Sequence, residues 1–445
     1  MTNSNDNIGY FPQMPVCDKH LSVEMNSDFT LPDYQVEIRR LLSTRVEILP
    51  PAEFLDNSSA SFEGDVSIKI LYLGADGKLY CTTLSDKYKY EAPLEFNAHN
   101  VSLEDVTLIP TCKCESVNTR VLAPRKLNVR TKLHCHVQAL SPAFHSPNIM
   151  GAHTPSSIES LVFETPALNK KKCVSEPLIL TDFIALESEL DDMRIIDIHP
   201  HVSIAECLPS KDKISIRGEL TMKILYCNDA QSDYPLTLVR KIPLSSTMRC
   251  DGVNNSFDCT ASGVVIDEQI NIDQSGVKLE MTVVASAKAQ KNENVAYIGD
   301  AYSTERKAEC KNTEVVVPIH LKCSNGNLTQ NEYFSLDEIK LSQDAKIIDA
   351  CAVSHVNDIA FEGGKLILTG NCEYQIIYFC DDEYSSKSLT APLRYEIDGR
   401  FEAVKPETLK WSVETHASQV RARHDGDRLF VDCELNFCIL LQEII

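Results

Sequence analysis

The chain has 445 residues and a formal net charge of −21 at pH 7. A surface this acidic repels phosphate backbones and anionic lipid headgroups, so nucleic acid and membrane surfaces are not expected as partners. The N-terminus lacks the basic and apolar stretches of a secretion signal, and no apolar run is long enough to span a bilayer, so a cytoplasmic location is expected. The 17 cysteines include no CxxC pair and are expected to be thiols there.

In chain order, the sequence divides into three similar stretches and the segments between them. A domain commonly takes ~100–200 residues, so two to four domains are expected. We expect an N-terminal tail at 1–26, repeats at 27–140, 177–290 and 332–445, a linker at 141–176, and a connector with a strand-like stretch at 291–331.

Each repeat is expected to open with a short helix. Residues 32–38 contain Asp33 at a position where it would cap a helix, and residues 335–338 fit a capping box. The corresponding stretch of the middle repeat, from Thr181, gives a weaker signal.

A long alternating stretch follows in all three repeats, at 60–72, 214–226 and 366–378. Apolar residues at every second position predict a β-strand with one buried face and one wetted face. In each copy a glycine precedes a tyrosine by eight positions, and the tyrosines are 154 and 152 residues apart; the pairs are Gly64–Tyr72, Gly218–Tyr226 and Gly370–Tyr378. The glycine predicts a bulge or a close backbone approach, and the tyrosine a core aromatic side chain.

A second alternating strand recurs at nearly the same period. Its copies lie at 127–137, 277–285 and 429–437, and each follows a turn-like sequence, at 123–126, 273–276 and 424–427. Three tandem repeats of this kind predict an all-β chain of mainly antiparallel sandwich or barrel-like domains with short helices.

Several of these stretches together resemble a known family. They are Leu31-Pro32-Asp33, the run at 37–42, the strand from Gly64 to Tyr72, the turn and strand start at 124–127, and the run at 300–305. They are similar to the SPOCS domain, a repeated domain of spore-forming Clostridia and their relatives that is found in SipL-type proteins. The resemblance covers nearly the whole chain, with the first copy the closest match.

This resemblance implies a role in building the spore envelope. SipL-type proteins act in the mother-cell cytosol and bind the ATPase that polymerises into the basement layer of the coat. The expected partners are therefore spore-coat morphogenetic proteins or further copies of the chain, with recruitment to the forespore surface. SipL carries binding to that ATPase on a LysM module, and no LysM segment is recognised here, so that interaction is not expected to carry over.

The sequence contains few residues that suggest chemistry. Phosphate-loop, dinucleotide-binding, nucleophile-elbow and HExxH motifs are all missing, so we expect a protein that is not an enzyme. The acidic pairs at 191–192 and 381–382 lie in turn-like sequence and are expected to be solvated. Sites assembled from distant residues are the remaining route to an enzyme, and a polar-lined pocket in the structure would favour it.

One set of residues is a candidate zinc site. If Pro124 is the centre of the hairpin, Cys114 lies opposite His134 and Cys112 lies opposite His136, and two thiolates with two imidazoles suit tetrahedral zinc. The simpler interpretation is that both histidines belong to a wetted face, and a slip of one residue would separate the four side chains. A metal- or redox-dependent binding protein is thus the alternative to a scaffold, and no other cofactor is expected.

Two further candidates are weaker. The sequence His199-Pro200-His201 is a possible ligand pair, although a loop after a strand explains it as well. Arg125 and Lys126 form either a partner-binding spot or a plain charged turn.

Overall fold

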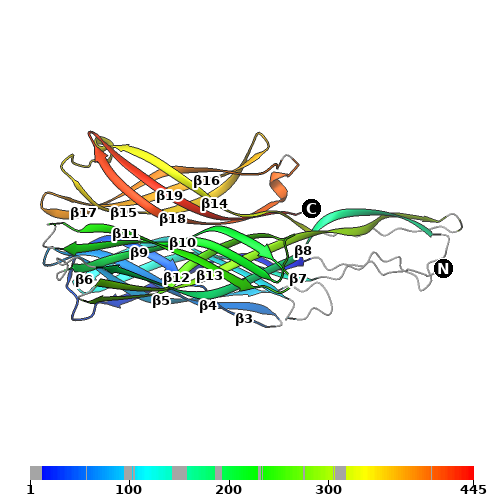
Figure 1. The fold of residues 1–445 in the computed structure, drawn as a ribbon, viewed down its shortest axis with the longest axis horizontal. Coiled ribbons are helices and arrows are strands. Elements are labelled where there is room, and N and C mark those ends of the chain that lie inside the picture. Colours follow the sequence, from blue (N-terminus) through cyan, green and yellow to red (C-terminus); the bar gives the residue numbers. More distant parts are fainter. Residues whose placement is uncertain are drawn as a thin grey trace.

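The computed structural model describes residues 13–56, 58–94, 103, 106–142, 158–185, 193–228, 232, 234–273, 276–303, 305, 317–401 and 403–444. Most of them are in antiparallel strands, which confirms the predicted all-β fold class. The strands form six sheets that pair into three units, and the units lie against one another in one elongated molecule (Figure 1). None of the helices in the described part is long and apolar enough to cross a bilayer.

Each unit has the same strand order. A first sheet holds the first, last and second-to-last strands of the unit, and a second sheet holds the strands between them. Unit 1 has β1 (Gln13–Thr30), β7 (Lys126–Pro142) and β6 (Thr107–Ala123) in its first sheet, and β2 (Ile38–Ile48), β3 (Ala52–Leu55), β4 (Ser59–Gly74) and β5 (Leu79–Pro93) in its second.

The other two units repeat this arrangement with three strands in each sheet. The strands of unit 2 are β8 (Ile158–Ala185), β9 (Met193–Ser210), β10 (Lys213–Asn228), β11 (Leu236–Arg249), β12 (Asp258–Asp273) and β13 (Gly276–Ser303). The strands of unit 3 are β14 (Pro318–Ser335), β15 (Lys346–Glu362), β16 (Lys365–Cys380), β17 (Glu383–Ile397), β18 (Leu409–Asp425) and β19 (Arg428–Ile444).

One apolar core fills the space between the two sheets of each unit. The predicted alternating strands supply its centre: β4, β10 and β16 from one side, and β7, β13 and β19 from the other. Leu127, Leu279 and Leu429, which lie at or near the start of the second predicted strand in each repeat, are fully buried. Both strand predictions are therefore confirmed, and the units are two-layer sandwiches.

Each unit begins with a strand that lies mostly outside the predicted repeat. Residues 13–26, expected in a tail, lie in β1; residues 158–176, expected in a linker, lie in β8; and residues 318–331, expected in a connector, lie in β14. These strands add to the free edge of β7, β13 and β19. In β1 the signal is present, because Leu21, Val23 and Met25 alternate with polar residues and pack on the core.

The helix predictions have a mixed outcome. Residues 32–38 form a turn, with the Gln35 amide donating to the Pro32 carbonyl at 3.0 Å, so the helix expected there is wrong. α1 (Leu336–Ile339) is present with Ser335 as its N-cap residue, but Ser335 makes no side-chain capping bond. The Leu336 amide instead donates to the Asp427 carbonyl, so the β18–β19 turn takes the place of the capping box. A 3₁₀ turn lies at Pro406–Thr408.

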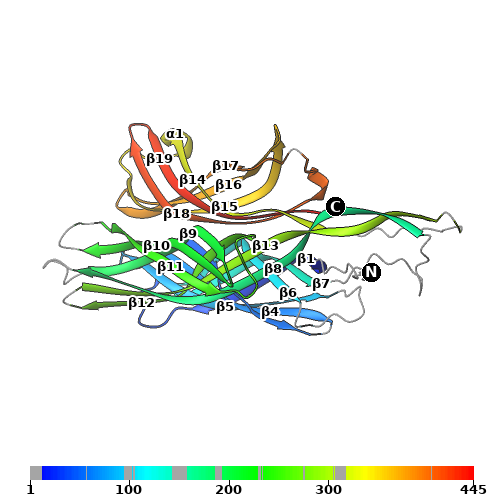
Figure 2. The ribbon, with the colours of Figure 1, turned by 45° about the vertical axis from the view of Figure 1, so that its right-hand side comes forward.

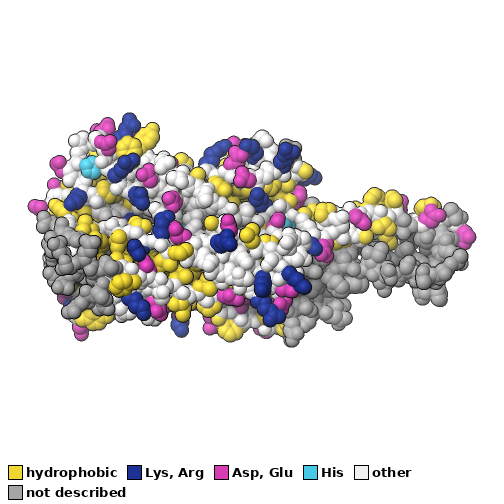
Figure 3. All heavy atoms as spheres, in the orientation of Figure 1, with side chains coloured by type: hydrophobic (Ala, Val, Ile, Leu, Met, Phe, Trp, Pro, Cys, Tyr) yellow, Lys and Arg dark blue, Asp and Glu magenta, His cyan; other side chains and the backbone are white. Residues whose placement is uncertain are grey.

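Unit 2 extends into a two-stranded arm. From Lys291 to Ser303, β13 pairs with β8 alone, because β12 pairs with β13 only up to Gln290. The arm projects beyond the body of the three sandwiches (Figure 2). In the space-filling view its described part shows apolar and acidic side chains at the surface, and the sandwiches show apolar, basic and acidic ones (Figure 3).

Candidate functional site: the junction of the three units

The second sheets of the three units meet at one junction. Their central strands carry polar side chains at Lys69, Lys223 and Gln375, which are 154 and 152 residues apart, the same spacing as the repeated tyrosines. Each side chain donates to a backbone carbonyl of another unit: Lys69 Nζ to Ile198 at 3.2 Å, Lys223 Nζ to Ala350 at 2.6 Å, and Gln375 Nε2 to Leu42 at 3.0 Å. Unit 1 thus contacts unit 2, unit 2 contacts unit 3, and unit 3 contacts unit 1, which closes a ring.

Apolar side chains at matched positions pack at the centre of this ring. A single buried cluster contains Leu71, Leu225 and Ile377, each of which precedes a repeated tyrosine, together with Leu42, Ile196 and Ile348. These side chains lie on the face of each sheet opposite its own core. The prediction that this face is wetted is wrong here, because the other two units cover it.

At a third matched position, each unit carries a basic side chain that contacts another unit at the rim of the junction. Arg40 Nη1 lies 3.0 Å from Ser385 Oγ and its Nη2 lies 2.8 Å from Glu383, in unit 3. Arg194 of unit 2 donates to the Leu79 carbonyl of unit 1 at 2.9 Å. Lys346 of unit 3 lies over the ring of Tyr234 in unit 2, with Nζ 3.6 Å from the ring centroid. A cation near the start of the edge strand of each second sheet thus reaches a neighbouring unit: unit 1 reaches unit 3, unit 2 reaches unit 1, and unit 3 reaches unit 2.

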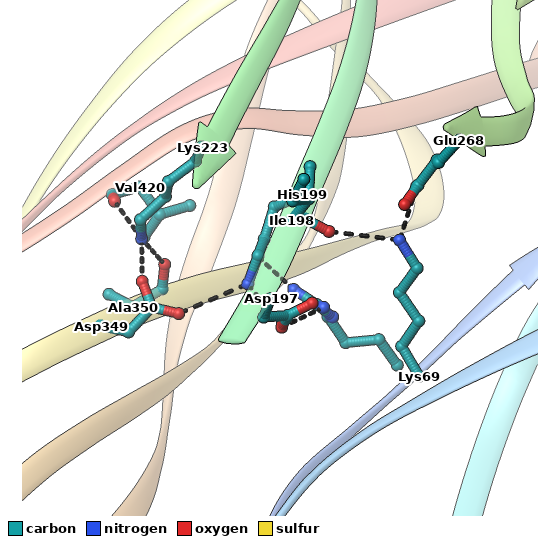
Figure 4. Close-up of polar contacts among 10 residues, drawn as sticks. Lys69, Asp197, Ile198, His199, Lys223, Glu268, Asp349, Ala350 and Val420 are labelled. Carbon is teal, nitrogen blue, oxygen red and sulfur yellow. Dashed lines mark hydrogen bonds and ion pairs between the residues drawn. The ribbon is translucent and has the colours of Figure 1, made fainter. Parts of the chain in front are cut away.

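Between these contacts lies a buried chain of charged groups (Figure 4). Arg45 Nη2 lies 2.5 Å from Asp197 Oδ2, and His199 Nε2 lies 3.0 Å from the same oxygen and 3.5 Å from Asp349 Oδ2. Lys223 forms an ion pair with Asp349, and the side chains of Asp197 and Asp349 are 3% and 2% exposed. Buried carboxylates need such partners, because an unpaired charge out of water is costly.

The charges fix each other's protonation states. Burial raises the pKa of Asp197, but the positive charge of Arg45 and the contact with His199 outweigh that effect and hold the pKa below its ordinary value. Burial lowers the pKa of His199, and the nearby Arg45 charge lowers it further. Arg45 also contacts His199 Nδ1, so the neutral ring accepts a hydrogen bond there and carries its proton on Nε2, 3.0 Å from Asp197 Oδ2.

The two thiols beside these buried charged groups are poor nucleophiles. Burial raises the pKa of Cys351 to about 11, and burial also raises the pKa of Cys81. Both are therefore protonated at neutral pH, whereas attack on a substrate requires a thiolate. The arrangement is suited to holding three units in one geometry.

The predicted zinc residues do not come together. The expected register holds from Val121–Leu127 to Ser116–Lys132, and a bulge at Glu115 then shifts the pairing by one residue. Lys113 therefore lies opposite His134, and Cys112 lies opposite Cys135. The cysteines face the core, with Cys112 Sγ 2.8 Å from Cys135 Sγ, and the histidines lie on the outer face.

Two of the three repeated glycines lie at a close backbone approach, as predicted. A Cβ at Gly218 would overlap the Ser203 carbonyl, and one at Gly370 would overlap the His355 carbonyl. At both places the neighbouring strand has one extra residue. At Gly64 the Tyr88 ring fills this space, because β2 has ended before the prolines at 50 and 51.

The repeated tyrosines are packed to different degrees. Tyr72 is fully buried and donates to the Val36 carbonyl at 3.2 Å. Tyr226 and Tyr378 are half-buried, and Tyr378 packs against the core of unit 3.

Arg125 lies in the β6–β7 turn, and Lys126 follows it as the first residue of β7. The Arg125 guanidinium donates to the carbonyls of Pro32, at 3.0 Å, and Gln35, at 2.8 Å, and lies 3.5 Å from Glu37. Arg125 therefore fixes the neighbouring 32–38 turn within its own unit. Lys126 is exposed at the start of β7.

The remaining candidates lie in different settings. The loop expected at His199–His201 is wrong, because both histidines lie inside β9. Asp381 and Asp382 form the exposed β16–β17 turn in left-handed conformation, with φ of 52° and 57°. Residues 191–192 lie outside the described part of the chain.

Sequence reasoning missed the junction residues, although a signal for them exists. Lys69, Lys223 and Gln375 were read as part of a solvated face, but the neighbouring Leu71, Leu225 and Ile377 share that face and are apolar. An apolar residue at the same position in three repeats predicts a shared contact surface.

One comparison with known proteins gives a match. The family model SipL, SPOCS domain matches residues 193–273. This range runs from the first residue of β9 to the last residue of β12, so it covers the second sheet of unit 2 and one strand of the first. No curated protein and no solved structure matches the chain.

Proposed function

We propose that the chain is a non-catalytic structural protein of spore-envelope assembly that acts by binding other proteins. The observation that carries this proposal is the SPOCS match over 193–273, in a unit whose strand order recurs in units 1 and 3. On this proposal all three units are SPOCS-type domains, and the chain acts in the mother cell at the forespore surface. Its partners are coat morphogenetic proteins or further copies of itself.

The closed junction supports a scaffolding role. Domains joined by flexible linkers move relative to one another, whereas a large buried interface holds them in place. Here the three units share an apolar cluster and buried ion pairs. A rigid block of this kind presents its outer surfaces at fixed distances, which suits assembly into a layer.

The arm supports contact with another protein. Large apolar side chains on it are strongly exposed: Leu161 55%, Val162 49%, Phe163 45%, Tyr297 42% and Tyr302 55%. Exposed apolar surface concentrated on one element is typical of protein-interaction sites. Phe163 stacks on Tyr297, with ring centroids 5.7 Å apart, so the arm offers aromatic side chains of the type enriched in interfaces.

The proposal is tested with a fluorescent fusion of the full chain through sporulation in the native host. A shell of fluorescence around the forespore is the expected result, and a diffuse signal in vegetative cells would contradict the proposal. Phe163→Ser is expected to weaken recruitment by removing an apolar contact. Phe54→Ser is the matched control, because Phe54 is 54% exposed on β3, away from the arm.

A further inference from the structure

The outer face of the unit 1 first sheet carries a cluster of histidines and one carboxylate. His20 on β1 lies directly opposite His136 on β7, and Asp18 and His134 follow diagonally on the same face. The rings of His20 and His136 stack, with centroids 4.2 Å apart. Neither cysteine of the zinc set expected from the sequence belongs to this group, because both face the core.

The ligand atoms of the cluster are close together. His136 Nε2 lies 2.7 Å from Asp18 Oδ1, and His20 Nδ1 lies 3.1 Å from His134 Nε2. One ligand atom each from Asp18, His20 and His136 lies within 4.8 Å of the other two. Tetrahedral zinc holds nitrogen and oxygen ligands at ~2.0–2.2 Å, which places them about 3.4 Å apart, so small side-chain rotations bring these atoms to bonding distance.

Metal binding requires neutral imidazoles and an ionised carboxylate, so protons compete with the ion for these side chains. Lys410 of unit 3 also faces Asp18 and His20, and its positive charge weakens the site without occupying it.

We propose that Asp18, His20 and His136, with His134 as fourth ligand, bind a divalent transition metal ion of the zinc class. Imidazole and carboxylate donors suit zinc, and the ligands come from two strands. The ion would fasten β1, an edge strand of its sheet, to β7. This site is independent of the proposed function and of the cysteines.

The test titrates the metal-free protein with Zn²⁺ and measures the heat of binding by isothermal titration calorimetry. Thermal unfolding is then measured with and without the ion. The expected result is one Zn²⁺ per chain and a higher midpoint of thermal unfolding with the ion bound. His20→Gln and His136→Gln are each expected to lower the affinity more than about tenfold. His424→Gln is the matched control on an exposed strand position of unit 3 and is expected to leave the affinity unchanged.

Co²⁺ gives a second readout that does not depend on stability. The expected spectrum has the visible bands of a tetrahedral site with nitrogen and oxygen ligands and no thiolate charge-transfer band. A thiolate band, no stoichiometric binding, or unchanged affinity in the His20→Gln/His136→Gln double variant would each overturn the proposal. Unchanged urea midpoints of the metal-free variants would exclude misfolding as the cause of a loss.

Discussion

At the scale of single residues, the repeated glycines are the most constrained positions. Gly218→Ala would drive a Cβ into the Ser203 carbonyl, and backbone cannot move away as a flexible side chain can. We expect the free energy of unfolding to fall by about 1–3 kcal/mol. Urea unfolding measures this change. Arg217→Ala is the control, because its side chain is 75% exposed and should cost less than about 0.5 kcal/mol; an equal loss in both variants would contradict the account.

A histidine between units 2 and 3 should make stability depend on pH. Burial, and then the charge of His416, lowers the pKa of His201 to about 3, whereas an unfolded histidine titrates near ~6.5. Below that pH the unfolded state takes up a proton that the folded state does not, so stability is lost as the pH falls. From pH 7 to 5 we expect a loss of about 1–2 kcal/mol from this group, which is only partly buried.

Urea unfolding of His201→Gln at both pH values checks this assignment. The variant should lose less stability on acidification than the parent chain does, whereas the surface variant His424→Gln should behave like the parent. An identical pH dependence in His201→Gln and the parent would show that His201 is not the group responsible.

At the scale of elements, the strongly alternating strands could be predicted from the sequence. The strands without a clear alternation of apolar and polar residues were missed. β4, β10 and β16 were evident because thirteen residues alternate. β8 was missed because about half of it forms the two-stranded arm. No second sheet is paired with the arm there, so its apolar and polar residues need not alternate. The zinc set was misassigned because the bulge at Glu115 moves Cys112 and Cys114 to the opposite face from the two histidines, and no residue type there marks the bulge.

The contact between β10 and β15 should depend on one buried ion pair. Lys223→Met leaves the Asp349 carboxylate buried without its cation, and breaking such a pair costs about 3–5 kcal/mol. Urea unfolding measures the loss. Lys365→Met is the matched control, because Lys365 and Glu396 are 55% and 51% exposed and an exposed pair contributes at most about 1 kcal/mol. Similar losses in the two variants would argue against a buried pair at the junction.

At the scale of the whole molecule, the three units behave as one structure because each one covers the others. The unit core could be predicted from alternation within one repeat. The junction could not be predicted in this way, because its charged residues are not repeated. The position of Asp197 in unit 2 and Asp349 in unit 3 is held by the neutral Ser43 in unit 1. A second matched position is held by Arg45, His199 and Cys351, which have three different chemistries. The three units therefore differ in sequence where they meet, and their contact surfaces are complementary.

The central claim is that the units fold as one closed ring, and the single tryptophan provides the direct test. Trp411 lies in β18 of unit 3, so its fluorescence reports that unit, whereas far-UV circular dichroism reports all three. In a urea titration under reducing conditions, we expect the two signals to change together. Lys69→Met, which removes a contact between units 1 and 2, should shift the Trp411 transition to lower urea. Separate transitions, with the Trp411 midpoint unmoved by Lys69→Met, would contradict the ring.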